Sequence, residues 1–258
     1  MQRFRRILGL GDETDGADQP PPDTGRPVIA VGDIHGRDDL LRAMLARIED
    51  SAKGAETPPP ELVFLGDYVD RGEDSAAVLR RLMALQREGS FKTVCLMGNH
   101  ERMLLDFLTD ASAGPLWLHN GGLQTMLSFG VGGPRSLRPD GAELDRMRRE
   151  LADRLGPDTT GFLTGLPLSH RAGNVFFCHA GADPGKPVDE QPERELLWRR
   201  PRAGEPPRSD GLWVVHGHTP ADEPIAANGR IAIDTGAYFS GKLTAVRLCN
   251  SQVDFLST

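Results

Sequence analysis

Short apolar runs that each end in glycine and then an acidic or amide residue recur in the first half of this chain. Residues 28–31, 62–65 and 94–97 are apolar and are followed by Gly-Asp, Gly-Asp and Gly-Asn. Runs of this length with glycine at their ends are typical of buried strands. Residues 37–50 and 75–88 lie between these runs and carry apolar side chains at helical spacing. This alternation predicts an α/β sheet with helices on its faces.

The second half of the chain has a different pattern. A predicted helix at 143–155 is followed by five short runs typical of strands, at 175–178, 213–215, 230–233, 243–248 and 252–256. Because few helices separate these runs, we expect a second sheet that packs on the first. The sequence therefore predicts an α/β fold in which residues 27–258 form a single domain.

The N-terminal segment is predicted to lie outside this domain. Residues 12–26 are acidic, rich in proline and poor in apolar side chains, so residues 1–26 are expected to be a disordered tail. The basic residues at 1–10 fit either a frayed terminus or a short anchor for a partner or membrane surface. The frayed terminus is the simpler interpretation, because chain ends are commonly mobile.

Composition excludes several classes of protein. Thirty Lys and Arg residues against 37 Asp and Glu give a net charge of −7, which argues against a general nucleic-acid coat. No apolar run approaches the ~18 residues of a membrane span, so no integral membrane association is expected. The three cysteines, Cys95, Cys178 and Cys249, show no CxxC spacing. They argue against a disulfide framework or a cysteine zinc site and favour a cytoplasmic location.

Polar side chains gather directly after the predicted strands. In open α/β sheets, ligands bind at the carboxyl ends of the strands. One such residue alone would fit a turn, a helix cap or a buried structural histidine. Many of them at one sheet edge indicate a functional site. The residues concerned are Asp33, His35, Asp67, Asp70, Arg71, Asn99, His100, His179, His216 and His218.

The chemistry of this set points to metal ions and phosphate. Imidazole and carboxylate ligands together suit manganese, iron, zinc or nickel. The ligands suffice for two divalent ions, and a shared carboxylate would give a two-metal site about 3.5–4 Å across of the kind that serves displacement at phosphorus. The guanidinium of Arg71 matches the geometry of phosphate oxygens.

The ordered motifs GDIHG, GDYVDRG, GNHE, HAG and GHT, spread over residues 28–248, resemble those of the PPP family of metal-dependent phosphatases. The resemblance is strongest to its bacterial and phage branch, which bacteriophage lambda protein phosphatase typifies. It implies a metallophosphoesterase-type β-sandwich of two mixed sheets flanked by helices, with the active site at the strand carboxyl ends. It also implies two bound divalent ions, with manganese preferred over iron, zinc or nickel.

The resemblance further implies a role for each matching residue. Asp33 and His35 would bind the first metal, Asp67 would bridge both, and Asn99, His179 and His218 would complete the second. His100 would be the general acid, oriented by Asp70, and Arg71 would bind the phosphoryl group. The branch has a second arginine in a Trp-x-Arg pattern, which favours Arg200 over its neighbour Arg199.

These roles imply a phosphatase that hydrolyses phosphoserine and phosphothreonine in proteins by in-line attack of a metal-bridging hydroxide. Symmetrical diadenosine tetraphosphatases share most of the motifs and are the first alternative. In that group the second motif usually lacks the aspartate present here as Asp70, and the third usually ends in GNHD where this chain has Glu101. A non-catalytic metal-binding scaffold is the second alternative, although no catalytic group is missing. No nucleic-acid partner is expected.

Three further segments carry expectations. His216 would share a strand face with His218 and either support the metal ligands or fill a structural role. Residues 113–135 would form a cap, in which Trp117, Asn120 and the glycines make a substrate-facing loop or a helix at 123–129 merely packs on the sheet. Tyr238 is expected to edge the pocket.

Overall fold

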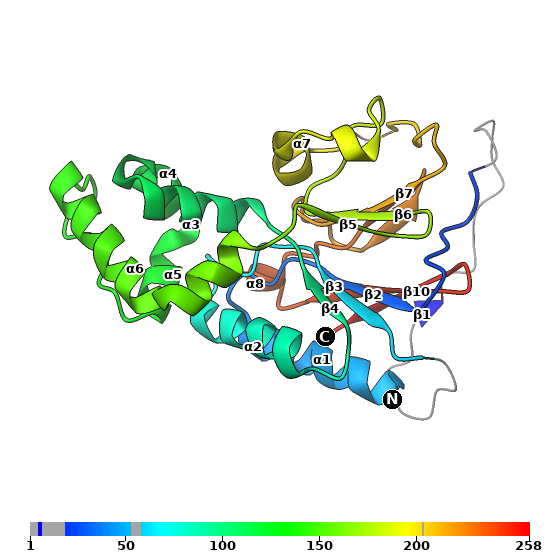
Figure 1. Ribbon diagram of the computed structural model, residues 1–258, viewed down its shortest axis with the longest axis horizontal. Coiled ribbons are helices and arrows are strands. Elements are labelled where there is room, and N and C mark those ends of the chain that lie inside the picture. The colour runs from blue at the N-terminus through cyan, green and yellow to red at the C-terminus, as the bar shows by residue number, and fades with distance from the viewer. Residues whose placement is uncertain (1–4, 7–18, 53–57, 203) are drawn as a thin grey trace.

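The computed structural model describes residues 5–6, 19–52, 58–202 and 204–258. Two mixed sheets lie one above the other, with helices below and to one side (Figure 1). This arrangement is the predicted α/β sandwich. No helix among the described residues is long and apolar enough to cross a membrane.

The first sheet has the strand order β1-β11-β10-β2-β3-β4. Its strands β2, β3 and β4 run parallel, whereas β10 pairs antiparallel with both β2 and β11. The bounds are β1 Arg5–Arg6, β2 Val28–Val31, β3 Glu61–Phe64, β4 Thr93–Cys95, β10 Thr244–Cys249 and β11 Gln252–Ser257. The three parallel strands are the apolar runs of the sequence, shifted by a residue at most where each begins.

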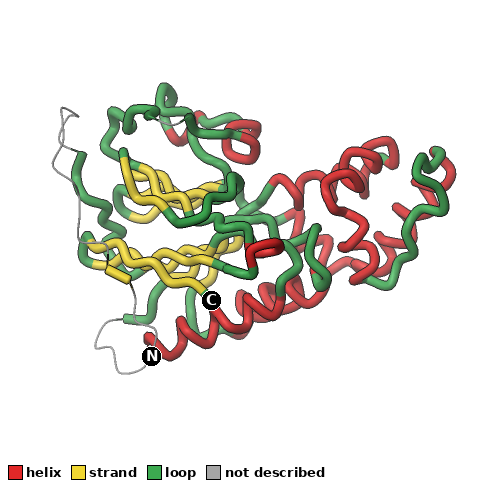
Figure 2. The backbone as a smooth tube through the Cα atoms, turned by 180° about the vertical axis from the view of Figure 1, so that it is seen from behind, coloured by secondary structure: helices red, strands yellow, loops and turns green. Residues whose placement is uncertain are grey.

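The second sheet has the order β5-β6-β7-β9-β8. Strand β7 runs parallel to β6 and β9, and the outer strands β5 and β8 are antiparallel to their neighbours. The bounds are β5 Ser169–Ala172, β6 Val175–Cys178, β7 Trp213–His216, β8 Ile225–Ala227 and β9 Arg230–Ala232. Figure 2 shows the two sheets stacked face to face.

The helices cover the first sheet and build a lobe beside it. Helices α1 and α2 lie along the first sheet, α3 to α6 form the helical lobe, and α7 lies above the second sheet (Figure 1). The bounds are α1 Asp38–Ala52, α2 Ser75–Glu88, α3 Asn99–Thr109, α4 Gly114–Trp117, α5 Leu123–Ser128, α6 Gly141–Thr164, α7 Glu193–Trp198 and α8 Ala237–Ser240. Short turns of other helix types are η1 Ala111–Ala113, η2 Leu118–Gly122 and η3 Val188–Glu190. The predicted helix at 143–155 is the first part of α6, which bends at Gly156 and Pro157.

Strand β2 explains why the apolar runs are continuous. Val28 and Ala30 pack in the core between the two sheets, and Ile29 and Val31 pack in the core beneath the helices. Successive side chains of a strand point to opposite faces, so a strand buried on both faces must be apolar at every position. The same burial anchors the polar residues that follow each strand.

The start of the ordered chain differs from the prediction. Residues 19–26, expected to be disordered, run along the second sheet. The carbonyl of Pro20 accepts a hydrogen bond from Trp213 Nε1 at 2.7 Å, and the amide of Asp23 donates to Asn174 Oδ1 at 2.6 Å. Arg5–Arg6 pairs with β11. The rest of the predicted tail, residues 1–4 and 7–18, lies outside the described residues.

Candidate active site

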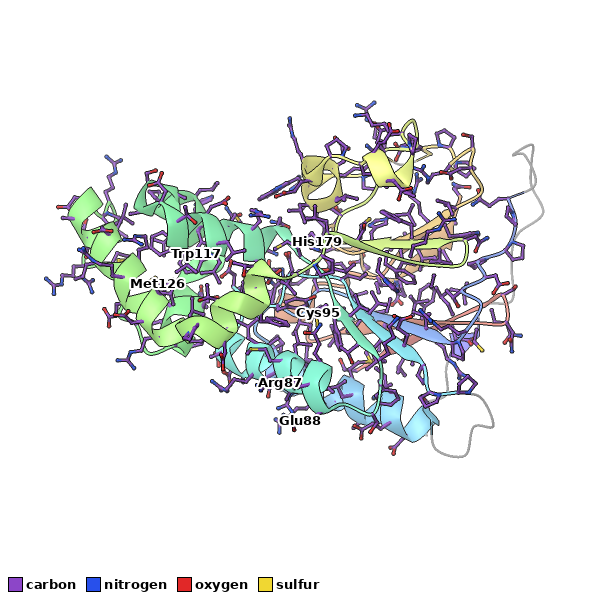
Figure 3. The ribbon with its side chains drawn as sticks, viewed as in Figure 1. Arg87, Glu88, Cys95, Trp117, Met126 and His179 are labelled. Atoms are coloured by element: carbon purple, nitrogen blue, oxygen red, sulfur yellow. The ribbon has the colours of Figure 1, made fainter. Side chains whose placement is uncertain are left out.

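The structure brings the predicted polar residues together at one edge of the molecule. Four strands end there, namely β2, β3, β6 and β7, and helix α3 begins there. His179 lies where the second sheet meets the helical lobe (Figure 3). The carboxyl ends of parallel strands coincide at one sheet edge, which is why residues from five segments converge. Buried members of the set are Asp33, His35, Asp67, Asp70, Asn99, His100, His179 and His216.

The backbone at this edge is strained. Five non-glycine residues of the set have left-handed φ angles, namely His35 at 46°, Asp67 at 54°, Asp70 at 72°, Arg71 at 68° and His218 at 66°. Such conformations cost of order 1–3 kcal/mol each and persist only where the surroundings fix them. Here the loops after β2 and β3 bond each other, because the amides of Ile34 and His35 both donate to the carbonyl of Asp67.

The side chain of Glu101 fixes the loop after β3 by hydrogen bonds to its backbone. Its buried carboxylate accepts hydrogen bonds from the amides of Gly98, Asp67, Tyr68 and Val69, at 2.7 to 3.1 Å. Burial raises the pKa of Glu101 to about 8, and the amides pull it back toward the charged form. This positioning role of Glu101 was not predicted from the sequence. A Glu three residues after the residue that caps a helix was the available signal.

The carboxylate of Asp67 is the centre of the site. Its Oδ1 lies 3.3 Å from His179 Nε2, and its Oδ2 lies 3.4 Å from His35 Nε2 and 3.8 Å from His100 Nε2. Burial alone would raise the pKa of Asp67, but the charges of the surrounding imidazoles, when those rings are protonated, lower it below its usual value. One carboxylate therefore faces imidazoles on both sides.

The nitrogen and oxygen atoms in this centre fit bound cations. His179 Nδ1 lies 3.0 Å from the carbonyl of Leu65 and can only donate to it, so Nε2 carries a lone pair. That lone pair faces the amide oxygen of Asn99 at 2.8 Å as well as Asp67 Oδ1. Burial lowers the pKa of His179, which keeps the ring neutral. Acceptors that face acceptors in a buried site call for a positive ion between them.

The same arrangement recurs around His35. Its Nδ1 lies 2.9 Å from the carbonyl of Val69, which leaves the Nε2 lone pair pointing at Asp67 Oδ2. Burial lowers the pKa of His35 to about 3. Two clusters of ligand atoms within 4.8 Å of one another share Asp67: His35, Asp67 and His100, and Asp67, His179 and His218. The residues present therefore fit two metal ions.

Asp33 lies next to a second buried acid that the sequence analysis did not select. Its carboxylate accepts a hydrogen bond from the amide of His218 at 3.1 Å. Burial, then the carboxylates of Asp234 and Asp67, raise the pKa of Asp33 well above its usual value, and burial raises that of Asp234 to about 6. Asp33 lies outside the two clusters named above. Asp234 begins the segment Asp-Thr-Gly-Ala-Tyr, whose last residue is Tyr238, the residue predicted to edge the pocket.

A buried acid–imidazole pair adjoins the Asp67 centre. His100 Nδ1 lies 2.8 Å from Asp70 Oδ2. Burial opposes protonation of His100, but Asp67 and Asp70 outweigh it and raise its pKa. Asp70 also accepts hydrogen bonds from Trp117 Nε1 at 3.0 Å and Thr125 Oγ1 at 2.6 Å. The helical lobe thus holds the carboxylate that orients His100.

The cap prediction is corrected by these contacts. Trp117 is fully buried against Phe107 and Asp70 and does not face a substrate (Figure 3). The predicted helix at 123–129 forms as α5, and its Thr125 reaches Asp70. The glycines do approach the site, because the amide of Arg71 donates to the carbonyl of Gly121 at 3.2 Å. A Cβ at Gly121 would lie 2.8 Å from the Arg71 nitrogen, so this approach needs glycine.

Two arginines border the site. Arg71 Nη1 lies 3.2 Å from His35 Nε2, and the guanidinium lies 4.9 Å over the ring of Tyr238. Arg200 is exposed, makes no hydrogen bond or ion pair within the described parts of the chain, and helps to lower the pKa of His218. Arg199 instead pairs with Glu195 and Glu205. Of the two neighbours, Arg200 is the one whose charge is free.

His216 occupies a separate position. It is buried at the end of β7, its Nδ1 lies 3.1 Å from the carbonyl of Gly217, and burial lowers its pKa to about 4. Gly217 precedes His218, so His216 bonds the backbone next to that side chain. Its support of the metal ligands stays a prediction.

Comparison with known proteins places this geometry in a family. Residues 26–256 match the calcineurin-like phosphoesterase family, which is almost the whole of the described domain. The chain belongs to this family. Its members hydrolyse phosphoesters at a site with two divalent metal ions, which agrees with the two ligand clusters around Asp67.

Relatives within the family differ in substrate. The chain is 32% identical to serine/threonine-protein phosphatase 1 of Salmonella typhimurium, over 86% of this chain and 92% of the relative. It is 28% identical to bis(5'-nucleosyl)-tetraphosphatase PrpE [asymmetrical] of Oceanobacillus iheyensis, over 84% of this chain and 86% of the relative. Among solved structures it resembles a putative diadenosine tetraphosphatase, with a TM-score of 0.58, 25% identity and coverage of 92% and 95%.

The hold of α5 on Asp70 can be tested by stability. We expect Thr125→Val to lower the free energy of unfolding by about 1–3 kcal/mol, because the buried carboxylate loses a donor and the Asp70 amide loses an acceptor. Urea unfolding measures the change. Thr109→Val is the matched control, since this exposed hydroxyl donates to Leu105 within α3, and it should change stability by less than about 0.5 kcal/mol. Equal effects of the two substitutions would contradict the inferred contact.

Proposed function

We propose that this phosphoesterase is a phosphomonoesterase that acts on phosphoserine and phosphothreonine in proteins. The observation that carries the proposal is the buried Asp70–His100 pair beside Asp67. A seryl or threonyl alkoxide is a poor leaving group and must be protonated as it departs, which is what a protonated imidazole at that place supplies. The similarity to serine/threonine-protein phosphatase 1 supports the same substrate class.

The proposed metal ligands are those of the two clusters with three changes: His100 is kept for acid catalysis, and Asp33 and Asn99 are added. Asp33, His35 and Asp67 would hold one ion, and Asp67, Asn99, His179 and His218 the other, with manganese as the proposed metal. Bound divalent ions would act as Lewis acids and make a coordinated water more acidic. Carbonyl contacts on the far nitrogens of His35 and His179 orient both rings for this role.

The chain's own residues would do the rest of the work. Arg71 and Arg200 would bind the phosphoryl oxygens, because guanidinium groups match them in shape and charge. His100 donates from Nδ1 to Asp70, so its Nε2 proton is the one available for the leaving oxygen. Trp117 and Thr125 keep Asp70 in place and thereby keep His100 oriented.

A second candidate function is hydrolysis of a dinucleoside tetraphosphate. The relatives named PrpE and the putative diadenosine tetraphosphatase structure support it. The sequence motifs suggested the symmetrical reaction as the alternative, whereas the names of these relatives specify the asymmetrical one. A nucleotide leaving group is far more acidic than an alkoxide and needs less protonation, so the buried acid pair favours the monoester. The complete pair also argues against a non-catalytic scaffold.

A direct comparison decides between the two substrates. The manganese-loaded protein should hydrolyse a phosphoserine peptide with a higher kcat/KM than it does diadenosine tetraphosphate, as measured by phosphate release and by chromatography of the nucleotides. A reversed order would favour the second candidate. Products of the dinucleotide reaction would then show whether cleavage is symmetrical.

The metal centre can be tested through its shared ligand. Asp67→Asn removes the charge between the two clusters, so we expect it to lose both bound metal, measured by elemental analysis, and activity. Asp145→Asn on the surface of α6 is the control and should retain both. Full activity of the wild-type protein after exhaustive chelation would overturn the metal assignment.

The acid assignment depends on the leaving group. His100→Asn should lower kcat on a phosphoserine peptide by roughly 10²–10⁴-fold, the size of a general-acid contribution. The loss on an aryl phosphate should be smaller, because a phenolate needs less protonation. Steady-state kinetics with both substrates measures the difference. Equal losses on the two would rule out this role for His100.

The arginine assignment has a built-in control in its neighbour. Arg200→Ala should lower kcat/KM by at least about tenfold, as expected when a charge-assisted hydrogen bond worth about 1.5–3 kcal/mol is lost. It should also weaken inhibition by free phosphate. Arg199→Ala should stay within about threefold of wild type, since Arg199 is committed to Glu195 and Glu205. The opposite ranking would move the phosphate ligand to Arg199.

A further inference from the structure

A cavity of about 440 Å³ lies beside the active site, at the end of α7 and the segment after it. We call it the arginine pocket. It is lined by Arg194, Glu195, Trp198, Arg199, Arg200, Arg202 and Glu205. The volume is within the range of small-molecule binding sites. Helix α7, which supplies one side of the pocket, lies above the second sheet (Figure 1).

The pocket borders the catalytic edge. The ring of Trp198 lies edge-on to that of His218, with centroids 6.3 Å apart. Arg200 lines the pocket and its charge also acts on His218. A substrate whose scissile phosphate lies at the Asp67 centre could therefore extend along Trp198 into the pocket.

The charges in the pocket are unbalanced. Both of its glutamates are already paired, Glu195 with Arg199, and Glu205 with Arg199 and Arg230. Arg194, Arg200 and Arg202 are exposed and have no ion-pair partner within the described parts of the chain. The acids therefore neutralise Arg199 and leave three positive charges in one small cavity.

Such a group of like charges is unfavourable without a counter-charge. Guanidinium groups are more weakly hydrated than ammonium groups and present paired donors that match phosphate oxygens. The proposed function needs one arginine of the three, Arg200, for the scissile phosphoryl group. Arg194 and Arg202 line the same pocket and have no role in the proposed function.

We propose that the arginine pocket binds a second phosphate group of the substrate, one that is not cleaved. This inference rests on the proposed function and refines it, because substrates that carry a second phosphate would be preferred over those with one. A second phosphorylated residue of a peptide would supply that group, and so would the polyphosphate chain of a dinucleotide. The chemistry recognised is the same in both cases, and Trp198, 40% exposed, offers an apolar face along the way.

The test compares matched substrates on one double variant. A peptide with one phosphoserine, the same peptide with a second phosphoserine a few residues away, and diadenosine tetraphosphate are the three substrates. The wild-type manganese-loaded enzyme should prefer the doubly to the singly phosphorylated peptide in kcat/KM. Arg194→Ala/Arg202→Ala should reduce that preference by about tenfold or more, through KM, as charge-assisted contacts to the second phosphate are lost.

A second pair of arginines provides the control. Arg80 and Arg87 are exposed on α2 and line a different cavity with Asp158. Arg80→Ala/Arg87→Ala removes the same charge from the molecule and should leave the preference for the second phosphate as in wild type. An equal loss in both double variants would overturn the proposal, because it would show an effect of overall charge. Thermal unfolding of both variants confirms that each is folded.

The remaining outcomes separate the pocket from the proposed function. A wild-type enzyme that cleaves the singly phosphorylated peptide and gains nothing from the second phosphate would overturn the pocket and leave the proposed function standing. An enzyme that cleaves neither peptide, but whose KM for diadenosine tetraphosphate rises about tenfold or more in Arg194→Ala/Arg202→Ala, would support the pocket and reject the proposed function.

Discussion

The structure depends on the convergence of electron-pair donors around the carboxylate of Asp67. The Nδ1 atoms of His35 and His179 donate hydrogen bonds to backbone carbonyls. In the neutral rings, each Nε2 therefore directs a lone pair at that carboxylate. Around His179 such an arrangement is unfavourable without a cation, whereas the guanidinium of Arg71 already supplies a donor to Nε2 of His35. Two features hold these residues in position. The packed strands lie beneath them, and the carboxylate of Glu101 accepts hydrogen bonds from four backbone amides of the loops.

The sequence predicted the parts of this fold that follow from burial on both faces of a strand. Strand β2 is apolar throughout, and β3 and β4 are apolar after their first residues, so the polar residues that follow the three parallel strands were expected to meet at one sheet edge. Strand β5 escaped prediction because its residues, Ser-His-Arg-Ala, lie at a sheet edge and need not be apolar. The order of residues 19–26 was not predicted for a similar reason. Hydrogen bonds between its backbone and the second sheet, and not apolar side chains, hold this segment in place.

In the site too, local sequence patterns predicted some residues, and contacts between distant parts of the chain determine the roles of others. Residues at the strand ends were identified, because motif and spacing are local. Trp117 and Thr125 were not assigned to Asp70, since their hydrogen bonds join residues 47 and 55 positions apart in the chain. A tryptophan in a glycine-rich cap suggests a substrate surface equally well until the direction of its ring is known. Asp234 was not predicted although it lies in the same segment as Tyr238, because an aspartate before Thr-Gly also fits a turn.

The position of the acid pair has a consequence for how the enzyme chooses substrates. Asp70 and His100 are both buried, and burial raises the pKa of Asp70 while its donors lower it. Building such a pair costs stability, which three donors to one carboxylate partly offset. A leaving group that departs readily without a proton would gain little rate from this pair. Under the two proposals, the arginine pocket would supply affinity for a substrate with several phosphates, and His100 would supply the proton that a departing alkoxide needs. The two features would therefore serve different steps, recognition of the substrate and cleavage of its phosphoester bond.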